Sequence, residues 1–274
     1  YYLVVLSDHG QSGGATFKQR YGMGLQVLVQ QYAHAARVQG IMETNESWGH
    51  VNVLVNDAIQ NDQRSSKALK RVTKGQTKAG EVKLGPDERE EELQEGAQIL
   101  VLASGNLGLV YNTMLEKRAT LEQIESFYPG LLAGLAAHEG VGWLMVASAE
   151  RGPVVIGQNG RYYLADGSVE GQNPLAGFGP NARHHLLRAD AFPDAPDIYI
   201  NSFYNAENNE VAAFEELIGC HGGLGGYQTR PFLLYPAELE ITEPDLVGAT
   251  AVYRQLKSWL YEVQRAKPMP AGSL

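Results

Sequence analysis

The chain has little of several features that mark particular protein classes. Its single cysteine, Cys220, cannot form an internal disulfide, so there is no sign of a secreted disulfide scaffold. No apolar run reaches the roughly 18 residues that a membrane-spanning helix needs. Lys and Arg number 22 against 31 Asp and Glu, without a basic stripe, so we expect no nucleic-acid polymer as partner.

The chain also lacks an initiator methionine and a signal peptide. It opens with Tyr1 to Leu6, an apolar and β-branched run typical of a strand that is buried on both faces, as in a parallel sheet. A soluble domain rarely begins on its own buried strand. We therefore expect a C-terminal portion of a longer protein, whose upstream part would hold the rest of the domain and any membrane segments.

Apolar spacing and turn residues predict alternating strands and helices. Helices are expected at 24–38, 51–59, 120–128, 131–135, 180–187 and 252–263, and strands at 99–102, 107–111, 141–146, 154–156, 162–164, 198–200 and 232–234. Thr120 and Gln123 form a capping-box pattern, Pro129 should break the helix that follows, and Asn159-Gly160 indicates a hairpin. The alternation favours a layered α/β domain.

Residues 61–96 differ in composition from the rest. Lysines and an arginine come first, residues 87–95 are mostly acidic, and apolar residues are scarce. This composition predicts a solvated, mobile insertion outside the core. We therefore assign residues 1–266 to one domain that carries this insertion, and residues 267–274, which contain two prolines, to a loose tail.

Asp8, His9 and Gly10 follow directly after the first predicted strand. Ligands gather at the carboxyl ends of strands in open α/β sheets. An adjacent carboxylate and imidazole suit Zn²⁺ or Mn²⁺, and the glycine lets the chain turn sharply. Taken alone, the motif also fits a surface turn in which Asp8 caps a helix.

His221 opens a second candidate segment, which is rich in glycine up to Gly226. A lone histidine in such a turn is more often structural than a ligand. The glycine spacing is not that of a P-loop. Ser104-Gly105-Asn106 predicts a tight strand connection and not a nucleophile elbow, which needs Gly-x-Ser-x-Gly.

Three stretches together resemble the alkaline phosphatase superfamily. They are Ser7 to Arg20 (SDHGQSGGATFKQR), Gly105 to Tyr111 (GNLGLVY) and Ala213 to Pro236 (AFEELIGCHGGLGGYQTRPFLLYP). The chain is most similar to the type I phosphodiesterase/nucleotide pyrophosphatase branch. Within that branch it resembles the C-terminal half of actinobacterial proteins that join an alkaline-phosphatase-like domain to holin-like membrane segments. The resemblance spans nearly everything except 61–96 and implies a layered α/β domain with a mostly parallel central sheet.

The resemblance also implies a two-metal site that hydrolyses phosphodiesters or related phosphate esters. Asp8 and His9 would serve one divalent ion, Zn²⁺ or Mn²⁺, and His221 the other. Three further ligands and a Thr or Ser nucleophile, which would form a covalent phospho-enzyme, would lie upstream of residue 1. The partner would be a small phosphorylated substrate, membranes would be reached only through segments outside this chain, and the chain alone would be inactive.

A non-catalytic function is the alternative: a membrane-tethered binding or assembly module with a degenerate phosphatase-like fold. More than 200 residues separate Asp8 from His221, which exceeds the spacing in compact family members, so residues 24–100 are interpreted as an insertion. The upstream sequence separates the two hypotheses. A Thr or Ser after an Asp-Gly motif, and an Asp with a His four residues later, would support the enzyme.

Overall fold

The computed structural model describes residues 2–34, 36–42, 77–78, 81–82, 96–216, 219–243 and 245–266. The chain divides into two compact units, called here the core unit (His9–Arg230) and the terminal unit (Tyr1–Asp8 with Pro231–Leu274). The predicted helix at 51–59, most of the 61–96 insertion and the 267–274 tail lie outside the described residues. Within the described ranges, no helix is both long enough and apolar enough to cross a membrane.

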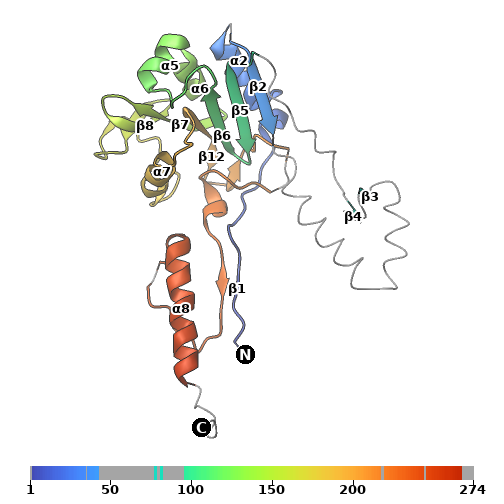
Figure 1. Cartoon of the computed structure of the whole chain (residues 1–274), viewed down its shortest axis with the longest axis vertical. Helices are drawn as coiled ribbons and strands as arrows, with labels where there is room; N and C mark the ends of the chain where they lie inside the picture. The colour runs from blue at the N-terminus through green and yellow to red at the C-terminus, as the bar shows by residue number, and fades with distance from the viewer. Residues whose placement is uncertain are drawn as a thin grey trace. The chain divides into compact units, whose positions relative to one another are not determined.

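An eight-stranded sheet forms the centre of the core unit, with the strand order β10-β9-β8-β7-β11-β6-β5-β2 (Figure 1). Its strands in chain order are β2 (Val38–Met42), β5 (Ile99–Ser104), β6 (Leu107–Asn112), β7 (Val141–Ser148), β8 (Gly152–Gly157), β9 (Gly160–Tyr163), β10 (Val169–Gly171) and β11 (Ile198–Ser202). These bounds agree with most of the predicted strands to within a few residues.

The sheet is mixed and not mostly parallel as expected. Only β2 and β5 pair in parallel, and every other neighbouring pair in this sheet is antiparallel. The reason is local: β5 and β6 are joined by Gly105-Asn106, and β8 and β9 by Gln158-Asn159. A two-residue turn can join only antiparallel neighbours.

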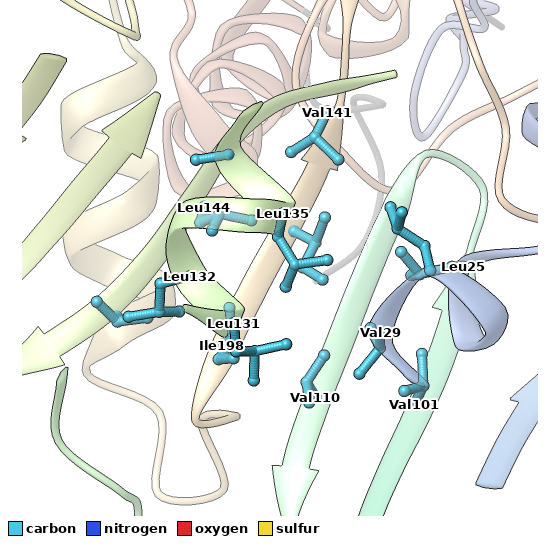
Figure 2. Packing of buried hydrophobic residues seen from close by; sticks show 14 of the residues in the cluster. Leu25, Val29, Val101, Val110, Leu131, Leu132, Leu135, Val141, Leu144 and Ile198 are labelled. Carbon is cyan, nitrogen blue, oxygen red and sulfur yellow. The ribbon is translucent and has the colours of Figure 1, made fainter. Parts of the chain in front are cut away.

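Helices pack on both faces of this sheet, which confirms the general α/β class. They are α1 (Phe17–Tyr21), α2 (Leu25–Ala33), α5 (Leu121–Phe127), α6 (Leu131–Ala137) and α7 (Ala182–Asp190). The larger apolar cluster joins α1, α2, α5 and α6 to the strands, whereas α7 packs with Trp143 and Tyr199 in a second cluster. Figure 2 shows α2 and α6 directing Leu25 and Leu135 towards the strands of the first cluster.

Local sequence signals account for the helix ends. Thr120 and Gln123 form the predicted capping box of α5, which ends before Pro129, and α6 begins after it. The helix expected at 24–38 stops earlier, because α2 ends at Ala33 and β2 begins at Val38. The side chain of Gln30 closes this connection: its Nε2 donates to the Ala36 carbonyl at 2.8 Å.

Shorter elements complete the core unit. β12 (Tyr204–Asn205) and β13 (Glu210–Val211) pair antiparallel, as do β3 (Thr77–Lys78) and β4 (Glu81–Val82). A 3-10 turn, η1, spans Gly226–Thr229. It ends the glycine-rich segment that begins at His221.

In the terminal unit, β1 (Val5–Leu6) pairs antiparallel with β14 (Leu233–Leu234), and α8 (Gly248–Ala266) follows. Val5 and Leu6 are 41% and 46% exposed, so the expectation of a first strand buried in a parallel sheet is wrong. An apolar run shows that a segment favours extended structure, but it does not name the partner strand. The helix is fastened to the chain before it, because buried Trp259 donates from Nε1 to the Glu240 carbonyl at 2.6 Å.

Candidate functional site

The segment that follows His9 and the loop that carries His221 are joined by main-chain hydrogen bonds. Ser12 and Cys220 exchange two N–H···O bonds, both 2.9 Å long. The Gly10 N–H donates to the Gln228 carbonyl at 3.1 Å. These bonds explain how segments more than 200 residues apart in sequence come to lie side by side.

A buried serine side chain and a glycine tighten this junction. The Ser12 hydroxyl donates to the Gly225 carbonyl at 3.0 Å and lies 3.4 Å from the Gln228 nitrogen, which donates to it. A Cβ on Gly10 would lie 1.9 Å from the Tyr227 carbonyl oxygen. The glycine was predicted as a turn residue, and the close approach of the 227–228 backbone is a second reason for it.

The junction places the two predicted ligand histidines together. The rings of His9 and His221 are stacked, with centroids 4.0 Å apart and an interplanar angle of 24°. His9 Nδ1 lies 2.8 Å from the Gly10 carbonyl oxygen. Because a carbonyl only accepts, Nδ1 carries the proton in this contact, so the neutral ring has its lone pair on Nε2. Such a contact commonly orients a metal-binding histidine.

Asp8, the third predicted ligand, is the last residue of the terminal unit, and it is exposed. His9 and His221 both belong to the core unit, so they are the two predicted ligands that the structure brings together within one unit. Among the residues that the structure describes, no three or more His, Cys, Asp or Glu side chains are gathered as a metal-binding group.

The turn between β5 and β6 supports the backbone of His221. Gly105 has a φ of +55°, and a Cβ at this position would lie 1.5 Å from the His221 carbonyl oxygen. The same turn accepts a 2.7 Å hydrogen bond from the Phe214 N–H, and the Gly105 N–H donates to the buried Glu215 carboxylate. The turn was predicted, but its contact with the histidine loop was not.

Two buried asparagines, Asn106 and Asn201, hold the residues that follow His221. The Asn106 Oδ1 accepts from the Gly223 N–H at 3.0 Å, and the Asn201 Oδ1 accepts from the Leu224 N–H at 2.7 Å. Both side-chain amides donate to the Leu224 carbonyl, at 3.1 and 3.0 Å. Sequence reasoning named Asn106 only as part of a tight strand connection and did not name Asn201. Asparagine is common in turns and at strand ends, so its type alone does not report burial.

Cys220 lies next to His221 but does not add reactive chemistry. Its side chain is buried, and burial together with the nearby Glu215 carboxylate raises the pKa of the thiol to about 12. The thiol is therefore protonated at neutral pH, whereas a nucleophile or a metal ligand needs the thiolate.

Comparisons with known proteins give no match: no protein-family model, curated protein or solved structure is similar to this chain.

Proposed function

We propose that this chain contributes Asp8, His9 and His221 to a two-metal site that hydrolyses phosphodiesters or related phosphate esters. Asp8 and His9 would hold one divalent ion, Zn²⁺ or Mn²⁺, and His221 the other. The nucleophile and three further ligands would come from a preceding part of a longer protein. The proposal takes the domain to have the layered α/β fold of the alkaline phosphatase superfamily.

The observation that carries the proposal is the 4.0 Å separation of the His9 and His221 rings. The two histidines were named from motifs at opposite ends of the sequence. A separation above about 12 Å would have ruled out a shared site, because paired metals lie about 4 Å apart and ligands reach about 2 Å.

The donor set fits this chemistry. Imidazole nitrogen beside carboxylate oxygen is a ligand combination suited to Zn²⁺ and Mn²⁺. When bound, the paired ions would neutralise the phosphoryl oxygens and stabilise the leaving oxygen. The contact of the His9 Nδ1–H with the Gly10 carbonyl orients the imidazole ring and leaves the lone pair on Nε2. Nε2 would therefore be the atom of His9 that binds the metal. The net charge of −9 offers a phosphate no attraction of its own, so the ions would supply the positive charge.

The test is metal-dependent hydrolysis of a nitrophenyl phosphodiester by the longer protein with added Mn²⁺ or Zn²⁺. We expect His221→Ala to lower turnover by orders of magnitude, because one ion loses a ligand. His184→Ala is the matched control, since His184 lies exposed on α7, and it should retain full activity. Full activity of His221→Ala would show that this histidine is structural.

A second arm uses the present chain alone, which should show no turnover because the proposal assigns the nucleophile to preceding residues. Metal-dependent turnover near that of the longer protein would show that the site is assembled from other residues. If the longer protein binds neither metal and shows no turnover, the non-catalytic alternative replaces the proposal.

A further inference from the structure

The loop that carries His221 is held from below by side chains of the central sheet. Asn106 lies in the turn between β5 and β6. Asn201 lies in β11, where it pairs with Leu107 of β6. Both asparagine side chains are fully buried. The two amides therefore come from neighbouring strands at the same end of the sheet and reach the same stretch, Gly223-Leu224.

The amide group is the side chain that can satisfy this stretch. Each asparagine offers an oxygen that accepts from a loop N–H and an NH₂ that donates to the Leu224 carbonyl. An aspartate would accept but could not donate. A buried main-chain group left without a partner costs about 1–3 kcal/mol, so the four bonds fix one loop conformation.

Gly223 is matched to these two amides. A Cβ at Gly223 would lie 2.5 Å from the Oδ1 atoms of both Asn106 and Asn201. The loop backbone can sit within hydrogen-bond distance of both side chains only because residue 223 has no side chain. This observation gives the second glycine after His221 a specific structural reason.

We infer that Asn106 and Asn201 are positioning residues that hold the His221 ring against His9. Their hydrogen bonds go to the backbone of Gly223 and Leu224, two and three residues after His221, and none of these bonds goes to the imidazole. The bonds of Gly10 and Ser12, next to His9, reach the same loop on either side of this stretch, at Cys220, Gly225 and Gln228. Removing the amides should therefore loosen residues 221–224 between those bonds while β11 and β6 stay paired. The consequence for metal binding rests on the proposed function, whereas the positioning of the ring does not.

The first experiment measures the ring contact in the present chain and needs no catalytic activity. Nuclear Overhauser contacts between the His9 and His221 ring protons are expected in the native chain, and they should be lost in Asn106→Ala and Asn201→Ala. The Gly223 and Leu224 amide protons should also exchange with solvent faster in these variants. Asn106→Ser, which keeps a small polar group in the turn, is the milder variant if the alanine variants do not fold.

Gln30→Ala is the matched control. Gln30 is also an amide that holds a loop, with bonds from Nε2 to the His34 and Ala36 carbonyls and from the Val38 N–H to Oε1. Its removal should speed exchange of the Val38 amide and leave the histidine contact unchanged. If the ring contact persists in every asparagine variant, or weakens equally in Gln30→Ala, the positioning role is refuted.

The second experiment measures the Mn²⁺ concentration that gives half-maximal turnover in the longer protein. The asparagine variants should raise this concentration about 10- to 100-fold, with turnover recovered at saturating metal, as expected for residues that orient a ligand. A lower maximal turnover with an unchanged half-saturating concentration would refute positioning, since that result reports only fewer folded molecules. If the native longer protein shows no turnover while the ring contact behaves as expected, the proposed function fails and the positioning role stands.

Discussion

Buried polar groups at the two ends of β11 are hydrogen-bonded by different kinds of side chain. At one end, which we call the amide end, Asn106 and Asn201 hold a loop with uncharged side chains. At the other, the charged end, the buried Asp197 carboxylate accepts from the N–H groups of Asn112, at 2.5 Å, and Ala119. Arg118 lies beside it and pairs with Asp190 at 2.6 Å.

The difference shows that a buried carboxylate can be satisfied entirely by main-chain donors. Both oxygens of Asp197 are occupied by main-chain donors, so this carboxylate fastens the connection after β6 to the start of β11. Burial raises the pKa of Asp197 above its ordinary value of 3.8, although the two N–H donors and Arg118 oppose the rise. At the amide end, the side chains that hold Gly223 and Leu224 are uncharged, and the buried Glu215 carboxylate accepts from the Gly105 N–H instead.

The largest predicted effect breaks the amide end. Gly105→Ala should lower the free energy of unfolding by about 4 kcal/mol or more, measured by urea denaturation. The new Cβ would lie 1.5 Å from the His221 carbonyl oxygen, and only a backbone shift can relieve that clash. The positive φ of +55° adds the strain of a left-handed alanine.

Gly22→Ala is the control for this prediction. Gly22 also has a positive φ, +71°, but nothing lies within 4 Å of the position that its Cβ would take. It should cost only about 1–2 kcal/mol. Equal effects of the two substitutions would mean that the contact between the turn and the His221 backbone contributes nothing.

The charged end should be the next most sensitive region. Asp197→Ala removes the acceptor of two main-chain N–H groups and leaves Arg118 without this neighbour, so we expect a loss of about 3 kcal/mol. Asp194→Ala is the control, because its side chain is exposed and its main-chain carbonyl, which accepts from Tyr111, is retained.

The same variant has an expected pH dependence. The folded pKa of Asp197 lies above the ordinary 3.8, so protonation favours the folded state. Its contribution is complete below pH 3.8 and is lost as the pH rises through the folded pKa. The native protein should therefore exceed Asp197→Ala in stability by more near pH 4 than near pH 7. A constant difference over that range would contradict the raised pKa.

Local features of the charged and amide ends were predictable from the sequence. The strands on either side of Gly105-Asn106, the capping box at Thr120 and the Asn159-Gly160 hairpin all depend on residues close together in the chain. Strand partners were not predictable in the same way. The apolar run at the start of the chain gave no sign that Val5 and Leu6 would pair with β14.

The candidate site shows the same division. His9 and His221 were named from motifs and from the family resemblance, because imidazoles beside glycines have recognisable patterns. Asn106, Asn201 and Ser12 act through burial and through contacts that span 23 residues for Asn201 and more than 100 for Asn106 and Ser12, and neither property has a sequence period. The residues that support the two histidines are therefore harder to predict than the histidines themselves.

The smallest predicted effect concerns Glu122, whose carboxylate fastens α5 to β7 at the charged end. The Ala149 N–H donates to it at 3.0 Å and the Ser148 hydroxyl at 2.8 Å. Chiefly the Ala149 hydrogen bond, and also that from Ser148, lowers the pKa of Glu122 from 4.5 to about 2. A carboxyl with a depressed folded pKa stabilises the fold above its unfolded pKa, and it loses that contribution as the pH falls through the folded value. The sign of the pKa shift is opposite to that of Asp197, because Glu122 is exposed and hydrogen bonding outweighs burial there.

Urea denaturation from about pH 6 to about pH 3 should therefore show the stability difference between the native protein and Glu122→Gln shrinking as the pH falls. Glu150→Gln neutralises a carboxylate on the adjacent turn without removing the Ala149 hydrogen bond, so it should show no such trend. If the Glu122→Gln difference stays constant over this range, the hydrogen bonds at Ser148 and Ala149 do not favour the charged form, and the pH dependence of the charged end rests on Asp197.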